Sequence, residues 1–203
     1  KQLMQYHQKD ERVRAFQKPN GGNVPKSWNF IFPYISGDYV MYMSQDDMID
    51  PDALQKMVAA MTDDVDYVVP RYFDYDYSTG KATFNKNLNK IENLRRKVDG
   101  IQAFALSMKW QIHGFGLFRR SLIDGIVLRD DIYISDEWMS RRTFLLSRKV
   151  VLCACNVYRG NNPEAITKQP KPYLVEGLIR DMMITDLFRE YQLPVQLEIY
   201  WRS

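Results

Sequence analysis

The sequence has 203 residues, a length typical of one domain with a substantial core and short for two. Hydrophobic residues make up 45% and charged residues 26%, and the formal net charge is only +3. This is the composition of a soluble globular enzyme or binding domain, and it predicts no nucleic-acid partner; the basic clusters at 95–97, 119–120 and 141–142 are expected to be solvated. No apolar run approaches the roughly twenty residues that cross a bilayer.

The first part of the chain predicts two helices separated by a strand. A helical pattern ends near Asp10, a short strand is expected at 12–17, and residues 19–22 form a turn. An apolar and aromatic stripe then predicts a helix over 26–34. Because the opening pattern is that of the end of a longer helix, we expect the chain to begin within a domain.

The apolar run at 39–43 is followed by a turn with two acidic residues, Asp46 and Asp47. The run 39–43 is expected to form a strand buried on both faces of a sheet. Asp50 and Pro51 are then typical of the N-cap and first residue of a helix. The predicted buried face of that helix comprises Leu54, Met57, Val58 and Met61. With a further strand at 66–70, the order predicts an α/β domain that binds ligands at the carboxyl ends of its strands.

The second half continues with alternating helices and strands. Residues 71–93 predict a hairpin or surface excursion with a turn at 78–80. Helices are expected over 98–107 and 137–147, and strands over 114–118 and 149–158. A helical extension is expected over about 170–203, with an apolar stripe of Leu174, Leu178, Met182, Leu187 and Phe188. Packing of this stripe on the domain itself is favoured over a peripheral membrane contact or a partner subunit.

The only two cysteines, Cys153 and Cys155, lie two positions apart in a run with strand character. Side chains at this spacing share one face of a strand but stand too far apart for an unstrained disulfide. We therefore expect reduced thiols and a cytoplasmic protein, with the inner face of the membrane as a further location. A zinc site is not expected, because the histidines have no metal-ligand spacing to the cysteines or to each other.

The pair Asp46-Asp47 is the most informative feature, because it follows the apolar strand and precedes the Asp50-Pro51 helix start. Two adjacent carboxylates at a strand end can hold Mn²⁺ or Mg²⁺, which prefer oxygen ligands and accept phosphate oxygens and water in their other positions. A solvated acidic turn is the alternative interpretation. The position at the end of a buried strand favours the metal site.

Several segments together resemble family 2 glycosyltransferases with the GT-A fold. Residues 36–51 are similar to the family's Gly-Glu-Tyr-Ile, Asp-Ser-Asp-Asp and Pro elements, and residues 19–22 to its Asn-x-Gly turn. Later, 134–138 is similar to its second acidic motif, and 157–159 and 165–167 to its Tyr-Tyr-Arg and Ser-Ile-Thr ending. The resemblance covers about residues 1–170, in order and with matching gaps.

The resemblance implies a nucleotide-diphospho-sugar transferase fold, a Rossmann-like mixed sheet flanked by helices, within one catalytic domain over 1–203. The family's first β-α-β segment, which ordinarily holds the nucleobase, is missing and should lie before Lys1. The implied activity is an inverting glycosyl transfer from a nucleotide-sugar, most simply a UDP-sugar, to a hydroxyl of a saccharide or lipid-linked acceptor. By family analogy the setting is surface-polysaccharide synthesis.

The resemblance also implies roles for individual residues. Asp47 would coordinate the metal, and Asp46 would share it or face the donor ribose. Asp136 matches the catalytic base, and Glu137 would take that role if the helix begins one residue later. Donor contacts are expected from Asn20, Lys26 and Arg159, and an acceptor-side wall from Trp110 and His113.

Two departures from the family pattern concern the donor side. Ser44 stands where many relatives carry the first Asp of the acidic motif, so metal binding rests more on Asp46 and Asp47. Trp28 stands where relatives often carry Arg, and Lys26 is the candidate to replace it. Two other functions stay open: a nucleotide-sugar or carbohydrate-binding module without turnover, and a metal-dependent phosphohydrolase, although the latter should show further His or Asp ligands.

Overall fold

A computed structural model describes residues 2–88, 97–160 and 173–202. Helices occupy α1 Gln2–Lys9, α2 Val24–Ile31, α3 Ala53–Ala60, α4 Gly100–Met108, α5 Ser135–Leu146, α6 Tyr173–Glu190 and α7 Val195–Arg202, with 3-10 turns at Phe32–Tyr34 and Arg120–Ile123. Strands occupy β1 Tyr39–Met41, β2 Met48–Ile49, β3 Tyr67–Asp76, β4 Lys81–Phe84, β5 Lys97–Asp99, β6 Leu117–Arg119 and β7 Lys149–Gly160. Two of the basic residues noted in the sequence, Arg95 and Arg96, and the motif at 165–167 lie outside the described residues.

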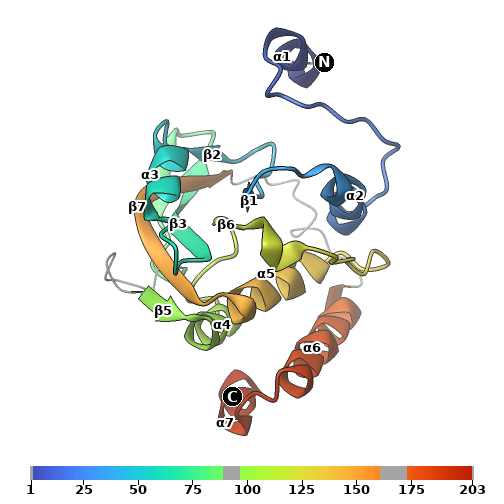
Figure 1. Cartoon of the computed structure of the whole chain (residues 1–203), viewed down its shortest axis with the longest axis vertical. Coiled ribbons are helices and arrows are strands. Elements are labelled where there is room, and N and C mark those ends of the chain that lie inside the picture. The colour runs from blue at the N-terminus through green and yellow to red at the C-terminus, as the bar shows by residue number, and fades with distance from the viewer. Residues whose placement is uncertain (1, 89–96, 161–172, 203) are drawn as a thin grey trace.

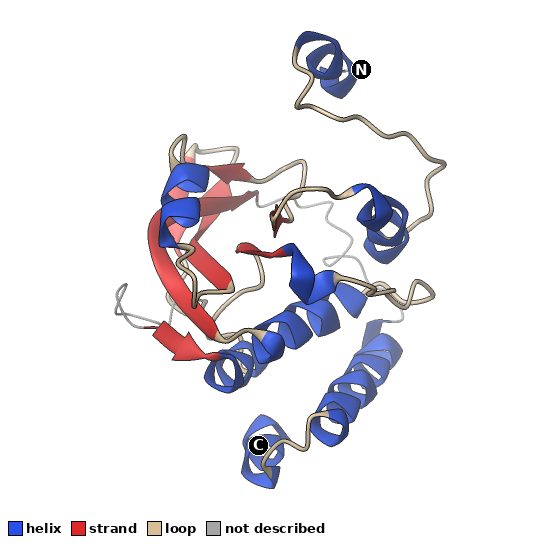
Figure 2. Cartoon of the chain, in the orientation of Figure 1, coloured by secondary structure: helices blue, strands red, loops and turns tan. Residues whose placement is uncertain are grey.

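The strands form one mixed sheet with the order β1-β6-β3-β7-β2, to which β4 is added beside β3 and β5 beside β7. Its centre is the parallel pair of β3 and β7, whose register shifts by a bulge between Pro70 and Arg71. The other pairings are antiparallel. The predicted α/β class with a mixed sheet flanked by helices is therefore confirmed (Figure 2).

Alternation along the two central strands sends side chains to opposite faces of the sheet. Tyr67 and Val69 belong to one core, which includes Trp28 of α2 and Phe144 of α5. Val68 belongs to a second core on the other face, against α3. A third cluster, built from Phe104, Met108, Ile184, Leu187 and Phe188, joins α4 to α6. The layers are thus α3, the sheet, α2 with α4 and α5, and finally α6 with α7 (Figure 1).

Several helices and strands form near their predicted positions. The helix over 26–34 corresponds to α2 and its 3-10 turn, and α4, α5 and β7 correspond to the elements expected at 98–107, 137–147 and 149–158. The excursion after residue 71 is a hairpin of β3 and β4 around the predicted turn, although β3 runs on to Asp76. Cys153 and Cys155 are buried free thiols, as expected.

Three local predictions are wrong. Residues 12–17 form no strand, because this extended segment leads away from the sheet toward α1 (Figure 1). The strand at 39–43 is not buried on both faces: β1 lies at the sheet's edge, paired only with β6 among the described strands, and its residues are half-buried. The helix after the acidic turn begins at Ala53, not Pro51.

The carboxylate of Asp50 does not cap that helix, because it has other partners. It accepts hydrogen bonds from the Asn156 backbone N–H (2.9 Å) and from the Tyr158 hydroxyl (2.9 Å). Asp50 therefore fastens β2 to β7, and Asp52 takes the N-cap position without a side-chain cap bond.

Two predicted apolar faces are also partly wrong. Met57 and Met61 of α3 are buried, but Leu54 and Val58 are 51% and 49% exposed. On α6, Leu187 and Phe188 pack in the core, as favoured, whereas Leu178 and Met182 are 67% and 68% exposed. The side chain of Leu174 lies outside the described residues.

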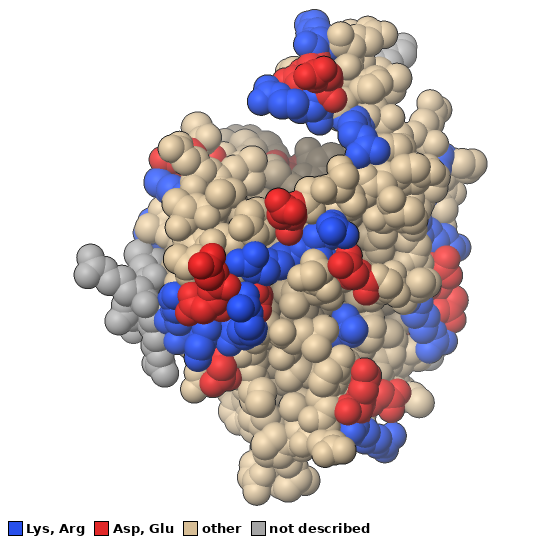
Figure 3. Space-filling view, viewed as in Figure 1, with Lys and Arg blue, Asp and Glu red and all other residues tan. Residues whose placement is uncertain are grey.

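The described residues form no helix that is both long and apolar enough to cross a membrane. On the face shown in Figure 3, lysine and arginine side chains are interspersed with aspartate and glutamate.

Candidate active site

The acidic turn lies where the chain crosses the end of the sheet. β1 and β2 occupy opposite ends of the strand order, so residues 42–47 pass from one edge to the other. The Asp47 backbone N–H donates to the Ser44 carbonyl (3.2 Å), which closes a tight turn. This crossing carries Asp46 and Asp47 over the carboxyl ends of β3 and β7, as the sequence predicted for a ligand site in an α/β domain.

Gly160, the last residue of β7, makes the close approach of the acidic turn possible. Its backbone N–H points at Asp47 Oδ1 (3.4 Å). A Cβ at this position would lie 2.5 Å from the Asp46 carbonyl oxygen and 2.7 Å from the ring of Tyr77. The Tyr77 hydroxyl in turn donates to the same carbonyl (2.5 Å), so the β3–β4 hairpin holds the turn from outside.

The electrostatics of the acidic turn favour a bound cation. Burial raises the pKa of Asp47, and the neighbouring Asp46 carboxylate raises it further. Arg159 of β7 lowers the same pKa, and it also lowers that of Tyr72. It precedes Gly160, whose N–H points at Asp47. Placing like charges together in a partly buried site is unfavourable unless a cation compensates them.

The residues at the turn fit a divalent metal that is shared with a ligand. Two carboxylates supply hard oxygen donors, and no group of three or more His, Cys, Asp or Glu suited to a metal occurs among the described residues. Such a cation would need phosphate oxygens and water to fill its coordination sphere.

The second acidic motif begins α5. Asp136 and Glu137 both line a cavity of about 70 Å³, together with Trp28, Tyr42 and Trp110. Ser135 fixes the start of the helix by donating from Oγ to the Arg129 carbonyl (2.6 Å). Asp136 Oδ1 accepts the Glu137 backbone N–H (3.0 Å). The helix therefore begins at Ser135 and carries both carboxylates in its first turn.

The two carboxylates have different surroundings. Burial raises the pKa of Asp136 to about 6, with Glu137 as the second cause. Its oxygens form no ion pair shorter than 4.0 Å with any described residue. Glu137 is instead paired with Arg180 (3.2 Å) and Arg141 (3.4 Å). Asp136 is thus the carboxylate available to a ligand, and its pKa lies near neutrality.

Tyr42 connects the two acidic clusters. Burial is the main cause that raises the pKa of its phenol, and Asp136, Asp47 and Asp46 each add to that rise. The hydroxyl lies 3.1 Å from Ser44 Oγ, in the turn that carries the acidic pair. Residues far apart in the sequence therefore meet around one tyrosine, which the sequence interpretation missed; its place two residues before the acidic motif was the available signal.

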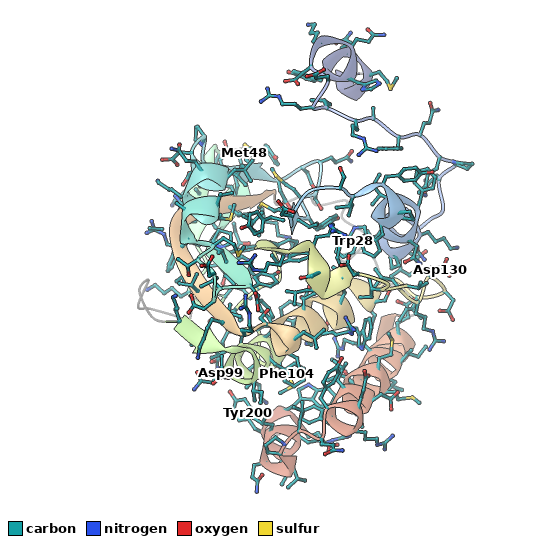
Figure 4. All side chains as sticks on the ribbon, in the orientation of Figure 1. Trp28, Met48, Asp99, Phe104, Asp130 and Tyr200 are labelled. Atoms are coloured by element: carbon teal, nitrogen blue, oxygen red, sulfur yellow. The ribbon has the colours of Figure 1, made fainter. Side chains whose placement is uncertain are left out.

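Aromatic rings form the floor between the clusters. The Tyr42 ring packs 4.5 Å from Trp28 and 6.4 Å from Phe115, measured between centroids. Figure 4 shows Trp28 on the side of α2 that faces the sheet, consistent with its place in the core. Trp28, which replaces the family's arginine, therefore builds the wall of the cavity rather than a polar donor contact.

The two predicted acceptor-side residues occupy different positions. Trp110 lines the cavity, is 44% exposed, and has a left-handed backbone (φ 54°), which is unusual for a bulky residue. His113 is 1% exposed and lies behind the cavity. Its Nδ1 accepts the Phe115 N–H (3.1 Å), so Nε2 donates to the Pro70 carbonyl (2.8 Å). Burial lowers the pKa of His113 to about 4, and the ring acts as a neutral internal strut.

The predicted donor contacts are spread along a larger groove. A groove of about 1140 Å³ runs between the segment 16–35 and the outer edge of β1, and Asn20 lines it. The Asn20 side chain accepts the Gly22 N–H (2.9 Å) and so shapes the turn at 19–22. Lys26 is exposed on α2 and lines neither cavity, whereas Arg159 lies beside the acidic turn.

Arg141 is the second residue that the sequence interpretation missed. It was expected on a solvated face, but it is only 4% exposed. Its guanidinium lies 4.8 Å from the centroid of the Trp110 ring and its Nη1 donates to the Glu137 carbonyl (3.0 Å). Arg141 also forms an ion pair with the Glu137 carboxylate. The spacing of four residues between them was a signal for that pair.

Comparison with known proteins shows the family and the fold. Residues 1–127 match the family described as Glycosyl transferase family 2. Glycosyltransferase GlyG of Streptococcus pneumoniae is 23% identical over 157 residues, which cover 73% of this chain and 52% of the relative. Putative glycosyltransferase EpsH of Bacillus subtilis is 25% identical over 154 residues, covering 72% of this chain and 43% of the relative. The chain thus spans about half the length of these two relatives.

Among solved structures, S. aureus TarS 1-349 in complex with UDP-GlcNAc has a TM-score of 0.58 at 14% identity, and covers 84% of this chain and 49% of that one. TarS 1-349 alone gives a TM-score of 0.57, with 79% and 48% covered. These values show a shared fold. Because the family match extends over more than half of the sequence, the chain belongs to glycosyl transferase family 2.

Proposed function

We propose that this chain carries the catalytic core of an inverting glycosyltransferase that moves a sugar from a UDP-sugar to an acceptor hydroxyl. The observation that carries the proposal is the position of Tyr42, which lines one cavity with Asp136 and whose hydroxyl lies 3.1 Å from Ser44 Oγ in the turn that carries the acidic pair. A transferase needs one site for the leaving diphosphate and a second for the acceptor, close enough to act on one sugar.

Asp47 and Asp46 are the proposed ligands of Mn²⁺ or Mg²⁺. Such an ion, when bound, offsets the negative charge that develops on the departing nucleoside diphosphate. Arg159 lies beside the same turn and is the proposed partner of a phosphate oxygen. The TarS neighbour was solved with UDP-GlcNAc, which supports a uridine diphosphate donor.

Asp136 is the proposed catalytic base. In its ionised form it would accept the proton of the acceptor hydroxyl while that oxygen attacks the anomeric carbon from the side opposite the diphosphate, which inverts the configuration. A pKa of about 6 leaves this carboxylate ionised at neutral pH and keeps it more basic than an ordinary aspartate. Glu137 is the less suitable base, because its carboxylate is already paired with two guanidinium groups.

Trp110 is the proposed stacking surface for an acceptor sugar. It is a partly exposed ring at the rim of the cavity that contains Asp136, and aromatic rings present a suitable apolar face to a saccharide. A saccharide or lipid-linked acceptor, a role in surface-polysaccharide synthesis, and work at the inner membrane face belong to the same proposal. They rest on the relatives' family alone.

The outer edge of β1 is relevant to how the nucleobase of the donor would be bound. Among the described strands β1 pairs only with β6, and the large groove lies against its other side. We propose that a further strand-helix-strand segment packs there in the complete enzyme and contributes the contacts to uracil.

The first experiment is calorimetric titration of UDP in the presence of Mn²⁺. We expect binding that EDTA abolishes and that Asp47→Ala weakens by at least about tenfold. Asp52→Ala is the matched control, because that carboxylate is exposed and its one ion pair among the described residues is with Lys56 on α3. Metal-independent binding of equal strength in both variants would contradict the proposed metal site.

The second experiment separates turnover from binding. A panel of UDP-sugars is offered with saccharide acceptors, and release of UDP is measured for the wild type, Asp136→Asn and Glu137→Gln. We expect Asp136→Asn to retain UDP binding but lose turnover by about 10²-fold or more. Binding without turnover in the wild type would favour the binding module, and release of phosphate from simple esters would favour the phosphohydrolase.

A further inference from the structure

An ion cluster joins the C-terminal helix α6 to the first turn of α5. Glu137 Oε2 lies 3.2 Å from Arg180 Nη1, which comes from α6, and 3.4 Å from Arg141 Nη1, one turn further along α5. The Arg141 side chain is 5% exposed and that of Arg180 is 29% exposed. This cluster is therefore mostly sheltered from water, where charge interactions are screened less than at the surface.

A second contact from the same helix holds the segment just before α5. Glu176 Oε2 accepts the backbone N–H of Tyr133 (3.0 Å). Glu176 and Arg180 are four residues apart, so they lie on one face of α6. Through these two side chains α6 holds both Tyr133 and Glu137, and Asp136 lies between the two held points.

The ionisable groups around Asp136 come from α5, from the segment just after β1 and from α6. On α5, Glu137 raises its pKa and Arg141 lowers it, after burial as the largest cause. The Tyr42 phenol, from the segment just after β1, lines the same cavity as Asp136. From α6, Arg180 reaches the neighbouring Glu137 and also pairs with Asp181. Glu137 thus acts on Asp136 as a like charge, and Arg180 is the cation from another element that compensates it.

We propose that Arg180 is a positioning residue for the acceptor-side carboxylate: by holding Glu137 against α6, it fixes the first turn of α5 and offsets the negative charge beside Asp136. The helix α6 lies beyond the residues that the family match covers. Only the use made of Asp136 as a base rests on the proposed function; the coupling between Arg180 and Asp136 does not.

The test measures the ionisation of Asp136 directly. The chain is labelled with ¹³C at the aspartate carboxyl carbons, the Asp136 signal is assigned by its loss in Asp136→Asn, and its titration is followed by NMR without any substrate. In Arg180→Gln, Glu137 is less compensated, so we expect the midpoint to rise by roughly half a pH unit. In Glu137→Gln the like charge is removed, and the midpoint should fall.

Two variants serve as controls. Arg189→Gln removes an exposed arginine of the same helix whose ion pair, within the part of the chain that the structure describes, is with Asp186; we expect an unchanged midpoint. Arg180→Lys retains the charge and should stay close to the wild type; it also keeps the test usable if Arg180→Gln does not fold. The proposal is overturned if Arg180→Gln and Glu137→Gln move the midpoint in the same direction, if neither moves it, or if Arg180→Lys shifts it as far as Arg180→Gln does.

Turnover gives the second readout. If the chain is a transferase, the acidic limb of its kcat/KM profile should move with the NMR midpoint in each variant. If the Asp136 midpoint shifts as expected but no transfer occurs with any sugar donor, the proposed function is wrong. The coupling between Arg180 and Asp136 would still be supported.

Discussion

Substituting alanine for Gly160 would test how tightly β7 is packed against the acidic turn. The added Cβ would lie 2.5 Å from the Asp46 carbonyl oxygen, whereas non-bonded carbon and oxygen atoms are normally more than about 3 Å apart. The turn, the hairpin residue Tyr77 or the end of β7 must therefore move by roughly half an ångström or more. Overpacking of this kind costs about 1–3 kcal/mol.

The movement should reach the candidate metal site as well as the stability of the fold. Gly160 also directs its backbone N–H at Asp47, so a displaced strand end weakens that contact as it shifts the carboxylate pair. We expect urea unfolding of Gly160→Ala to give a free energy lower by about 1–3 kcal/mol. Manganese-dependent UDP binding, measured on the same preparation, should weaken in parallel.

Gly177 offers a matched control in α6. A Cβ there meets nothing within 4 Å, so Gly177→Ala should stabilise the helix by up to about 1 kcal/mol and leave UDP binding unchanged. If Gly160→Ala matched the wild type in both unfolding and binding, the close contact between β7 and the acidic turn would not exist as described.

Three further predictions concern stability. Phe144→Ala empties a fully buried position and should cost about 3–5 kcal/mol in urea unfolding, whereas Val127→Ala, at a residue that is 78% exposed, should change little. Asp66→Ala removes the carboxylate shared by Arg148 and Arg119 and should cost about 1.5–3 kcal/mol at pH 7. The pKa of Asp66 is lowered, so the loss should shrink as the pH falls below 4. Asp136→Asn should be more stable than the wild type at pH 8, by on the order of 1–3 kcal/mol. The pKa of Asp136 is raised from 3.8 to about 6, so the cost of ionising it in the folded state builds up between these two pH values and is complete above pH 6; an equal advantage at pH 4 would refute this explanation.

The sequence predicted the order of elements well, because periodicity and turn residues are local signals. Position after an apolar strand identified the first acidic motif, and resemblance to a family identified the second. The structure brings both motifs next to Tyr42. Asp46 and Asp47 could be named from residue type and from their place after an apolar strand. Asp136 was named only because the segment around it resembles family 2 glycosyltransferases.

Local patterns did not reveal which faces and edges become buried. Leu54 and Val58 fit the apolar stripe of α3, yet the helix turns Met57 toward the sheet and leaves both exposed. Arg141 packs against Trp110, about thirty residues earlier, and Glu137 pairs with Arg180 of α6, 43 residues later. Such pairings between distant segments carry no periodic signal in a single sequence, and so the ion cluster was missed.

The left-handed backbone at Trp110 has a consequence for engineering this protein. A bulky side chain in that conformation is disfavoured by roughly 1–2 kcal/mol, a penalty that glycine would escape. A library selected only for heat resistance should therefore drift toward glycine at position 110. Glycine at this position would remove the indole ring from the cavity rim. Selection for stability and selection for sugar binding would therefore favour different residues at position 110.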